Sequence, residues 1–268
     1  MPPIRWQAAA LVSLAPLALV ACGGGGSSAQ EVQLTPVAYV TSAAKKTSEQ
    51  TSEHMSLRGS ARVAGTAIGV TAEGDFDAAS KTGAVHAQVL AGALNVPIDE
   101  VLDGGVLYLK SPVLAAGLTN GKTWFKLDLE RALATKGIDY SALSAQSPRD
   151  VLAKMQTMGG VTAVGDETIA GTATTHYRGR IDLSKLPQGA KLGALGNPSF
   201  GPYDVWIGKD DGLVRRVAYG YASTSGAGRQ RVSLRMDFSD FGKDVSVTVP
   251  TAAESLDVTK ESIEGLGG

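Results

Sequence analysis

From residue 55 onward the sequence consists largely of short segments in which apolar and polar residues alternate. In 55–63, 68–76 and 85–89 every second residue is apolar or small, and the residues between them are mostly polar or charged. This two-residue period predicts strands that turn one face toward a core. We expect further strands at 94–102, 106–110, 123–127, 161–168, 174–183, 203–208, 213–223, 230–238 and 243–249.

Turn-forming sequences separate several of these segments. The DGG sequence at 103–105, NG at 120–121 and DDG at 210–212 tolerate a positive φ. Short connections favour antiparallel neighbours, because a parallel pair needs a long crossover. The expected fold class is α+β, with a large antiparallel sheet of about 11 strands that is curved, since open sheets of about ten twisted strands curl. We expect helices packed on its concave face.

Helical spacing replaces the alternation in three segments. A Thr-Pro pair at 35–36 provides an N-cap and a first-turn proline for a helix over 36–52. A second helix is expected over 129–136, where a glycine follows. A third is expected over 147–158, where a Ser-Pro pair opens the helix and an apolar stripe predicts packing on the sheet; its members are Val151, Leu152, Met155 and Met158.

The first residues have the layout of an export signal. Arg5 precedes a mostly apolar run over 8–20, and small Ala21 precedes Cys22. This run of 13 residues is shorter than the roughly 20 that a membrane-spanning helix needs. The LVAC sequence at 19–22 resembles the lipobox of bacterial lipoproteins, which implies a diacylglyceryl or acyl lipid bound covalently to Cys22. The alternative is an incidental cysteine that ends an ordinary signal peptide.

The expected organisation follows from this signal. Residues 1–21 are expected to be a lipoprotein signal peptide, and 22–35 a flexible tether rich in glycine and serine. Residues 36–260 are expected to form a single domain, and 261–268 a C-terminal tail. The tether has a reach of roughly 20 Å. We therefore expect the protein at the extracytoplasmic face of the cell membrane, held by its lipid anchor.

Charge and composition exclude several functions. Lys and Arg number 25 against 26 Asp and Glu, a formal net charge of −1, which is unlike a nucleic-acid-binding protein. With a single cysteine the chain forms no internal disulfide. The three histidines, His54, His86 and His176, are scattered without metal-ligand spacing. We expect no catalytic residue, no metal site and no cofactor apart from the lipid on Cys22, so the protein is not expected to be an enzyme.

Very small residues occupy many of the positions that should face the core. They are Gly59, Ala61, Ala72, Gly74, Ala87 and Gly179. Because protein interiors are packed to the density of organic crystals, such a face must either draw helices close or enclose an apolar cavity. The sequence alone leaves these two alternatives open.

The order and spacing of several segments resemble the LppX/LprG group (LppX_LprAFG) of mycobacterial-type lipoproteins, whose relatives share the curved half-barrel of the LolA lipoprotein carrier. The segments are WFKLDL at 124–129, VGDETIAG at 164–171, THYRGRIDL at 175–183, VWI at 205–207 before DGL at 211–213, and FSDFG at 238–242 before Pro250. Together with the lipobox they span most of the chain. The resemblance implies a LolA-like half-barrel that takes up acyl chains of lipids or lipoglycans and helps to transport them across the cell envelope.

The ligand expected from this resemblance is a membrane lipid or lipoglycan, with an envelope transport protein as a further partner and no nucleic acid. An apolar pocket suits acyl chains, because each buried methylene contributes about 0.8 kcal/mol without a fixed partner. The candidate cavity residues are Ile68, Val70, Val85, Val89, Leu107, Leu109, Phe125, Leu127, Leu152, Met155, Tyr177, Ile181, Val205, Ile207, Val232, Leu234 and Met236. For each of them the alternative is an ordinary core position.

Two further alternatives stay open. The curved sheet is also compatible with a non-catalytic envelope sensor or protein-interaction module that has no lipid ligand. The basic groups at 45–46, 215–216 and 229–231 are compatible with contact to lipid phosphates or an anionic membrane, and equally with solvated surface.

Overall fold

The structure is a computed structural model that describes residues 34–63, 65–115, 121–134, 158–181, 199–225 and 228–260. The chain divides into two compact units, Met1–Gln33 and Leu34–Gly268, and all described residues belong to the second. The predicted signal peptide, Cys22 and most of the predicted tether therefore lie outside the described residues, as does the predicted tail.

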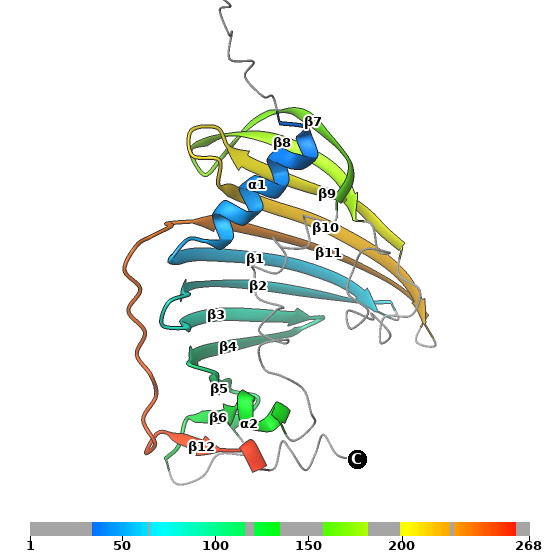
Figure 1. Ribbon diagram of the computed structural model, residues 1–268. Helices are drawn as coiled ribbons and strands as arrows, with labels where there is room; N and C mark the ends of the chain where they lie inside the picture. Colours follow the sequence, from blue (N-terminus) through cyan, green and yellow to red (C-terminus); the bar gives the residue numbers. More distant parts are fainter. Residues whose placement is uncertain are drawn as a thin grey trace, which may run out of the picture. The chain divides into compact units, whose positions relative to one another are not determined.

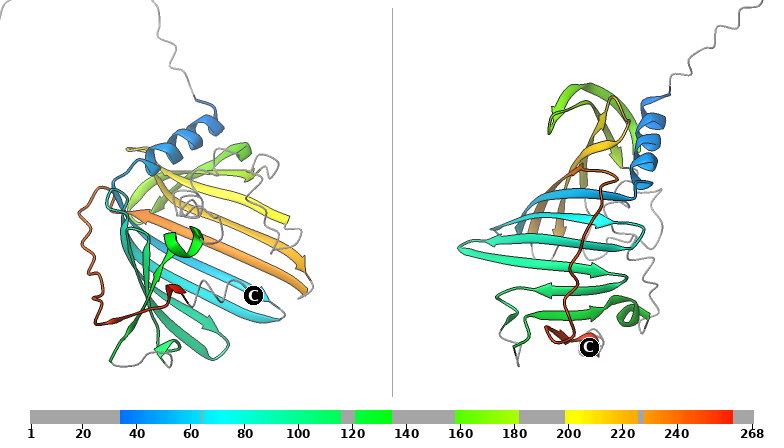
Figure 2. Two further views of the ribbon diagram at one scale, coloured as in Figure 1. Left: turned by 60° about the horizontal axis from the view of Figure 1, so that its bottom comes forward. Right: turned by 90° about the vertical axis from the view of Figure 1, so that its left-hand side faces the viewer.

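A single sheet of twelve strands forms most of the described structure, in the order β12-β6-β5-β4-β3-β2-β1-β11-β10-β9-β8-β7. It is open, with β12 and β7 at its edges, and it is curved (Figure 1, Figure 2). The strands are β1 (Ser52–Val63), β2 (Thr66–Asp77), β3 (Thr82–Ala91), β4 (Leu94–Asp103), β5 (Val106–Lys110), β6 (Trp124–Asp128), β7 (Met158–Ile169), β8 (Thr172–Ile181), β9 (Ser199–Gly208), β10 (Val214–Ser225), β11 (Gly228–Ser239) and β12 (Ser255–Asp257).

The predicted α+β class with a large curved antiparallel sheet is confirmed. Neighbouring strands pair antiparallel except β12, which pairs in parallel with β6 and makes the sheet mixed. The predicted turn at 103–105 joins β4 to β5, and there Gly104 and Gly105 have φ angles of 57° and 103°. These are left-handed values, which glycine adopts without the steric penalty of a β-carbon.

Two helices belong to the described chain, α1 (Pro36–Ser48) and α2 (Leu129–Ala134). Thr35 caps α1 as predicted, because its Oγ1 accepts a hydrogen bond of 3.3 Å from the N–H of Ala38. The expected end near residue 52 is wrong, since β1 begins at Ser52. In the described part of the chain no helix is long and apolar enough to cross a membrane.

The hydrophobic core lies between α1 and one face of the sheet. Val40, Ala43 and Ala44 of α1 pack against buried side chains of five strands, and Figure 1 shows α1 lying across β7 to β10. The sheet partners are Met55, Val161, Tyr203, Val205, Ile207, Val214, Val217, Met236 and Phe238. Because the α1 residues at 43 and 44 are alanines, the helix lies close to the sheet without leaving a void between them.

The predicted helix over 147–158 falls outside the described residues apart from its last residue. Met158 is not helical, because it begins β7 and pairs with Ile181 of β8. The two glycines that follow it also belong to β7.

The predicted strand at 243–249 does not form. Val245, Val247 and Val249 are half-buried, while Asp244 and the two residues between the valines are exposed. The alternation of apolar and polar residues in this segment therefore reflects burial of one side only. This segment runs past one end of the strands from β11 to β12 (Figure 1, Figure 2) without a place in the sheet. One-sided burial gives the same two-residue period as a strand, but a strand also needs a partner for its backbone hydrogen bonds.

Candidate functional site: an apolar face of the sheet

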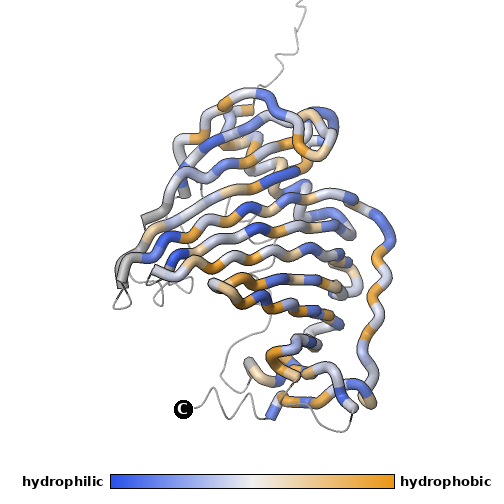
Figure 3. The backbone as a smooth tube through the Cα atoms, turned by 180° about the vertical axis from the view of Figure 1, so that it is seen from behind, coloured by the Kyte–Doolittle hydropathy of each residue, from blue (hydrophilic) through white to orange (hydrophobic). Residues whose placement is uncertain are grey.

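One face of the sheet is apolar across almost its whole width. Directly opposed residues of neighbouring strands lie on the same face, and Leu57 is opposed by Ala72 and by Met236. From Ala72 the row continues through Ala87 to Ile98. Figure 3 shows the corresponding alternation of hydrophobic and hydrophilic positions along the strands. We call this the inner face, because it is the face that packs against α1.

The strand registers place the predicted cavity residues together on this inner face. Those placed there are Ile68, Val70, Val85, Val89, Leu107, Leu109, Phe125, Leu127, Tyr177, Val205, Ile207, Val232, Leu234 and Met236. Leu152 and Met155 fall outside the described residues, and Ile181 lies at the end of β8 where only its backbone is described.

Burial divides this set into two groups. Val205, Ile207 and Met236 are 0 to 4% exposed and belong to the core beneath α1. The residues on β2, β3, β5 and β6, together with Val232 and Leu234, are only half-buried. Most of the described helix contacts fall on β7, β9 and β10 for α1 and on β5 and β6 for α2, and α1 also packs against Met55 of β1 and Met236 of β11. The inner face therefore has a covered part and a more accessible part that centres on β2 to β4.

Several inner-face residues were missed by sequence reasoning. Val96, Ile98 and Leu102 of β4 lie opposite Val89, Ala87 and Gly83. Their two-residue spacing was visible in the sequence, but Glu100 interrupts the apolar series at the same spacing. Two aromatic side chains of β10 were also missed, namely Tyr219 and Tyr221, which lie opposite Leu234 and Val232.

Glu100 is an ionisable group within this apolar face. It lies between Val85 of β3 and Leu109 of β5. Desolvation by burial raises the pKa of its carboxyl above the ordinary value of 4.5. A carboxyl in such surroundings is more easily kept neutral than in water, and its neutral form donates a hydrogen bond. Glu100 thus places a polar group on the accessible part of the apolar face.

The small inner-face residues are small for different reasons. A β-carbon at Gly59 would meet Leu234 Cδ2 at 3.6 Å and Val70 Cβ at 3.8 Å, which are ordinary contacts that leave space. At Gly74 it would collide with the carbonyl oxygen of Ala84 and with Val85. Gly74 is therefore required by close strand packing, whereas Gly59 leaves a shallow depression between two aliphatic side chains.

A pair of stacked tyrosines lies at the boundary between the covered and the accessible parts. The rings of Tyr203 and Tyr219 are 5.1 Å apart between centroids and 11° from parallel. Tyr203 is 2% exposed, and its Oη has no hydrogen-bond partner in the described chain. Burial raises the pKa of Tyr203 well above the ordinary tyrosine value, so its hydroxyl stays protonated and is able to donate.

The opposite face, which we call the outer face, is polar. Each histidine pairs there with its own aspartate: His54 with Asp75 at 2.8 Å, His86 with Asp99 at 2.7 Å, and His176 with Asp204 at 2.7 Å. His176 also stacks on Trp206, with ring centroids 4.2 Å apart. In the described ranges no group of three or more metal-ligating side chains is placed to hold an ion.

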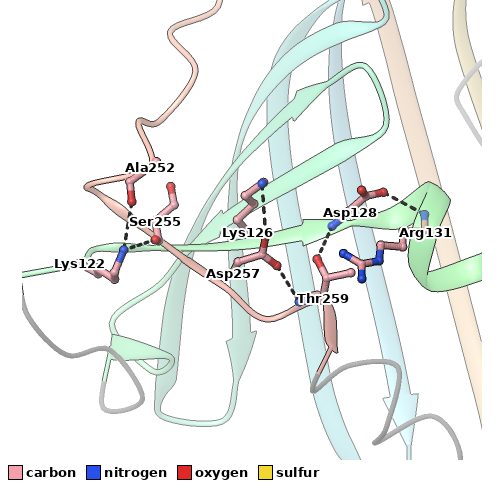
Figure 4. A network of polar contacts seen from close by, with 8 residues as sticks. All are labelled: Lys122, Lys126, Asp128, Arg131, Ala252, Ser255, Asp257 and Thr259. Atoms are coloured by element: carbon pink, nitrogen blue, oxygen red, sulfur yellow. Dashed lines mark hydrogen bonds and ion pairs between the residues drawn. The ribbon is translucent and has the colours of Figure 1, made fainter.

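The C-terminal segment holds the edge of the sheet beside the inner-face residues of β6. Figure 4 shows Lys122 reaching the carbonyl oxygens of Ala252, at 3.0 Å, and Ser255. Lys126 pairs with Asp257 at 3.3 Å, and Thr259 Oγ1 accepts a bond of 3.0 Å from the N–H of Asp128. These contacts fasten β12 to β6 and so fix Phe125 and Leu127, which lie between the bonded positions.

Comparison with known proteins places the chain among lipoproteins. The sequence profile of the family described as LppX_LprAFG lipoprotein matches residues 35–247. A Streptomyces griseus protein, described as an uncharacterized 31.2 kDa protein in the rplA-rplJ intergenic region, is 26% identical over 158 residues, which are 53% of this chain and 50% of that protein. The chain thus spans about half the length of this curated relative.

Comparison with solved structures concerns the fold. LprF from Mycobacterium bovis is 15% identical with a TM-score of 0.52, over 81% of this chain and 97% of LprF. LppX from Mycobacterium tuberculosis is 20% identical with a TM-score of 0.49, over 80% of this chain and 98% of LppX. The likeness to LprF concerns the fold, whereas the sequence profile covers most of the chain. The chain therefore belongs to the LppX_LprAFG lipoprotein family.

Proposed function

We propose that the protein binds acyl chains of lipids or lipoglycans against its inner face and takes part in their transport across the cell envelope. It is attached through a lipid on Cys22 to the extracytoplasmic face of the cell membrane, and it is not an enzyme. Membership of a lipoprotein family supports the attachment, and the LVAC sequence at 19–22 provides the cysteine.

The observation that carries this proposal is the continuity of the inner face. Aliphatic and aromatic side chains follow one another from β6 through β5, β4, β3, β2 and β1 to β11. Among the described residues of these strands, the charged side chains on this face are Glu100 and the buried Glu53 near the start of β1. Many of them are half-buried rather than fully buried. Such a surface holds acyl chains through burial alone, at about 0.8 kcal/mol for each methylene, and needs no exact position for each carbon.

Gly59 and the unpaired hydroxyl of Tyr203 add detail to this site. The depression at Gly59 lies between Val70 and Leu234, both on the accessible part of the inner face. Glu100 and Tyr203 supply the polar atoms that a lipid with a hydroxyl or ester group would contact. A ligand with one polar end and long apolar chains therefore fits this face better than a compact polar metabolite does.

The experiment that tests the proposal is native mass spectrometry. The chain from residue 23 onward is secreted behind an ordinary signal peptide from a bacterium with a complex envelope, purified, and then extracted with organic solvent. We expect a stoichiometric adduct that extracts as lipid. A protein mass without any adduct, unchanged after incubation with a lipid extract, contradicts lipid binding. It favours the envelope sensor or protein-interaction module instead.

Attachment is tested separately on the full chain. Purified from membranes, the full chain is expected to begin at Cys22 and to carry the mass of an acylated glyceryl group. A Cys22→Ser variant is expected to lack this mass. An unmodified cysteine in the membrane-bound protein contradicts the proposed anchor.

A further inference from the structure

Four arginines form two directly opposed pairs on the outer face of β1 and β11. Arg58 lies opposite Arg235, and Arg62 lies opposite Arg231. Between the pairs, Ser60 and Ser233 are opposed and their hydroxyls are hydrogen-bonded at 2.8 Å. We call these four residues, Arg58, Arg62, Arg231 and Arg235, the arginine cluster. They alternate along the strands with inner-face residues, so their side chains project away from the proposed acyl site.

This arrangement is unfavourable for the isolated protein. Like charges directly opposite each other on neighbouring strands are destabilising. Arg235 shares Asp237 with Arg216, at 3.2 Å and 2.9 Å, and Arg62 donates to the carbonyl oxygen of Gly65. Within the described chain, Arg58 and Arg231 form no ion pair. Arg58 and Arg231 therefore carry positive charge that no carboxylate of the described residues compensates.

An open groove lies beside these arginines. Its volume is about 740 Å³, and its lining includes Arg58, Arg231 and Arg235 together with residues of the same strands that alternate with the outer-face positions, namely Gly59, Tyr219, Tyr221, Val232 and Leu234. The other outer-face residues of its lining on β1, β10 and β11 are small, namely Ser60, Ala218, Gly220, Ala222 and Ser233. A neighbouring depression of about 570 Å³ includes Arg62 and shares Ser60, Arg231 and Ser233. Small residues between long basic side chains leave room for a group that is larger than a water molecule.

The nearby carboxylates do not neutralise the groove. Asp204 also lines it, but its Oδ1 is bonded to His176 Nε2 and to Arg178 Nε, each at 2.7 Å. Glu73 of β2 lies opposite Ser56, diagonal to Arg58, and in the described structure the two form no ion pair. The free guanidinium groups thus face solvent together.

We propose that the arginine cluster and its groove bind the phosphate groups of anionic phospholipids at the membrane surface. Guanidinium groups match phosphate oxygens with paired hydrogen bonds. The two pairs lie four residues apart, which is about 13 Å along a strand. This spacing exceeds one phosphate group and fits a surface that presents many of them. The four arginine side chains project from the outer face, so this proposal does not depend on acyl chains binding at the inner face.

Vesicle binding of the full chain tests this site. Cys22→Ser removes the acylated cysteine, and partition is compared between vesicles of phosphatidylcholine alone and vesicles that also contain phosphatidylglycerol. Vesicles of phosphatidylcholine alone measure any insertion of the apolar run at 8–20. The ratio of the partition coefficient for phosphatidylglycerol-containing vesicles to that for phosphatidylcholine vesicles therefore isolates the effect of charge. We expect Arg58→Gln with Arg231→Gln to reduce this ratio about 25-fold, which is about fivefold for each arginine near an anionic surface.

A matched variant removes two positive charges elsewhere. Lys81 follows β2 and Lys243 follows β11, toward the opposite ends of the strands from the pair formed by Arg62 and Arg231. Lys81→Gln with Lys243→Gln is expected to keep the ratio within about twofold of the starting chain, because salt screens distant charges. The arginine variant should also melt about 1 °C higher without vesicles, since a like-charge contact is relieved.

Three outcomes overturn the proposal. One is an absence of preference for phosphatidylglycerol in the starting chain. Another is an equal loss in the arginine and lysine variants, which assigns the effect to net charge. The third is displacement from vesicles by inorganic phosphate at constant ionic strength, which assigns the groove to a single free phosphate. Acyl-ligand retention, measured on the same variants, should be unchanged and so separates this site from the inner face.

Discussion

The backbone N–H of Val214 in β10 donates a hydrogen bond of 2.8 Å to the side-chain hydroxyl of Thr47 in α1. The same hydroxyl donates to the carbonyl oxygen of Ala43 at 2.8 Å, and both Thr47 and Val214 are fully buried. This hydroxyl therefore satisfies a buried backbone group of the sheet from the helix that covers it. It fixes the position of α1 where hydrophobic contacts alone would allow the helix to slide.

Thr47→Val tests this bond with little change in side-chain shape. The N–H of Val214 would lose its partner in a buried place, so we expect the free energy of unfolding to fall by about 1 to 3 kcal/mol. Urea unfolding measures the difference. Thr47→Ser keeps the hydroxyl and is the control for the lost bond. Unchanged stability in Thr47→Val would show that the sheet holds α1 without it.

Val89→Trp tests the accessible part of the inner face. Val89 is half-buried there, while Leu90 on the same strand lies on the outer face and is 44% exposed. We expect Val89→Trp to lower the amount of bound lipid with little loss of stability, and Leu90→Trp to change neither. A loss of about 1 to 3 kcal/mol in Val89→Trp would instead indicate overpacking of a solid core. Native mass spectrometry and urea unfolding together distinguish these results.

Glu100→Gln is expected to stabilise the protein near neutral pH. Because burial raises the pKa of Glu100, the folded chain holds this proton to a higher pH than the unfolded chain does. The stability that Glu100 contributes is present below the ordinary value of 4.5 and is lost as the pH rises through the raised pKa. The gain from glutamine should therefore shrink on acidification. Urea unfolding at several pH values checks this, and a gain that is constant with pH would contradict it.

Tyr203→Phe removes a buried hydroxyl that lacks a partner. Because an unsatisfied polar group opposes folding, we expect stability to stay the same or to rise by up to about 1 kcal/mol. Tyr219→Phe, on the half-buried partner of the stack, is the control. A clear loss of stability in Tyr203→Phe would mean that the hydroxyl is bonded in solution. Weaker lipid retention at unchanged stability would identify it as a contact of the ligand.

The two-residue period predicted the strands and the membership of the inner face because both depend on local alternation. Val70 and Val89, far apart from Val232 in sequence, were assigned to one face from spacing alone, and the registers place them together. Pairing between distant segments was not predictable in this way. β12 is only three residues long and pairs with β6 across more than a hundred residues, while 243–249 has the period but no partner.

The division of the inner face was equally invisible in the sequence. Val205 and Val232 have the same residue type in similar strands, yet α1 covers the first and leaves the second half-buried. Burial at this level depends on where a helix crosses the sheet, which alternation does not encode. The arginine cluster was not predictable from the sequence for a related reason, because its opposed pairs form only when β1 and β11 become neighbours.

The open ends of the sheet have a consequence for solubility at high local concentration. A flat edge strand invites pairing with another molecule and so promotes aggregation. At one end β12 is very short, and the ion pair of Lys126 with Asp257 lies along it. At the other end the pairing of β7 is interrupted twice by irregular register, and Gly160 has a left-handed φ of 60°. Neither end offers a long regular strand, so crowded copies of the protein can remain separate molecules.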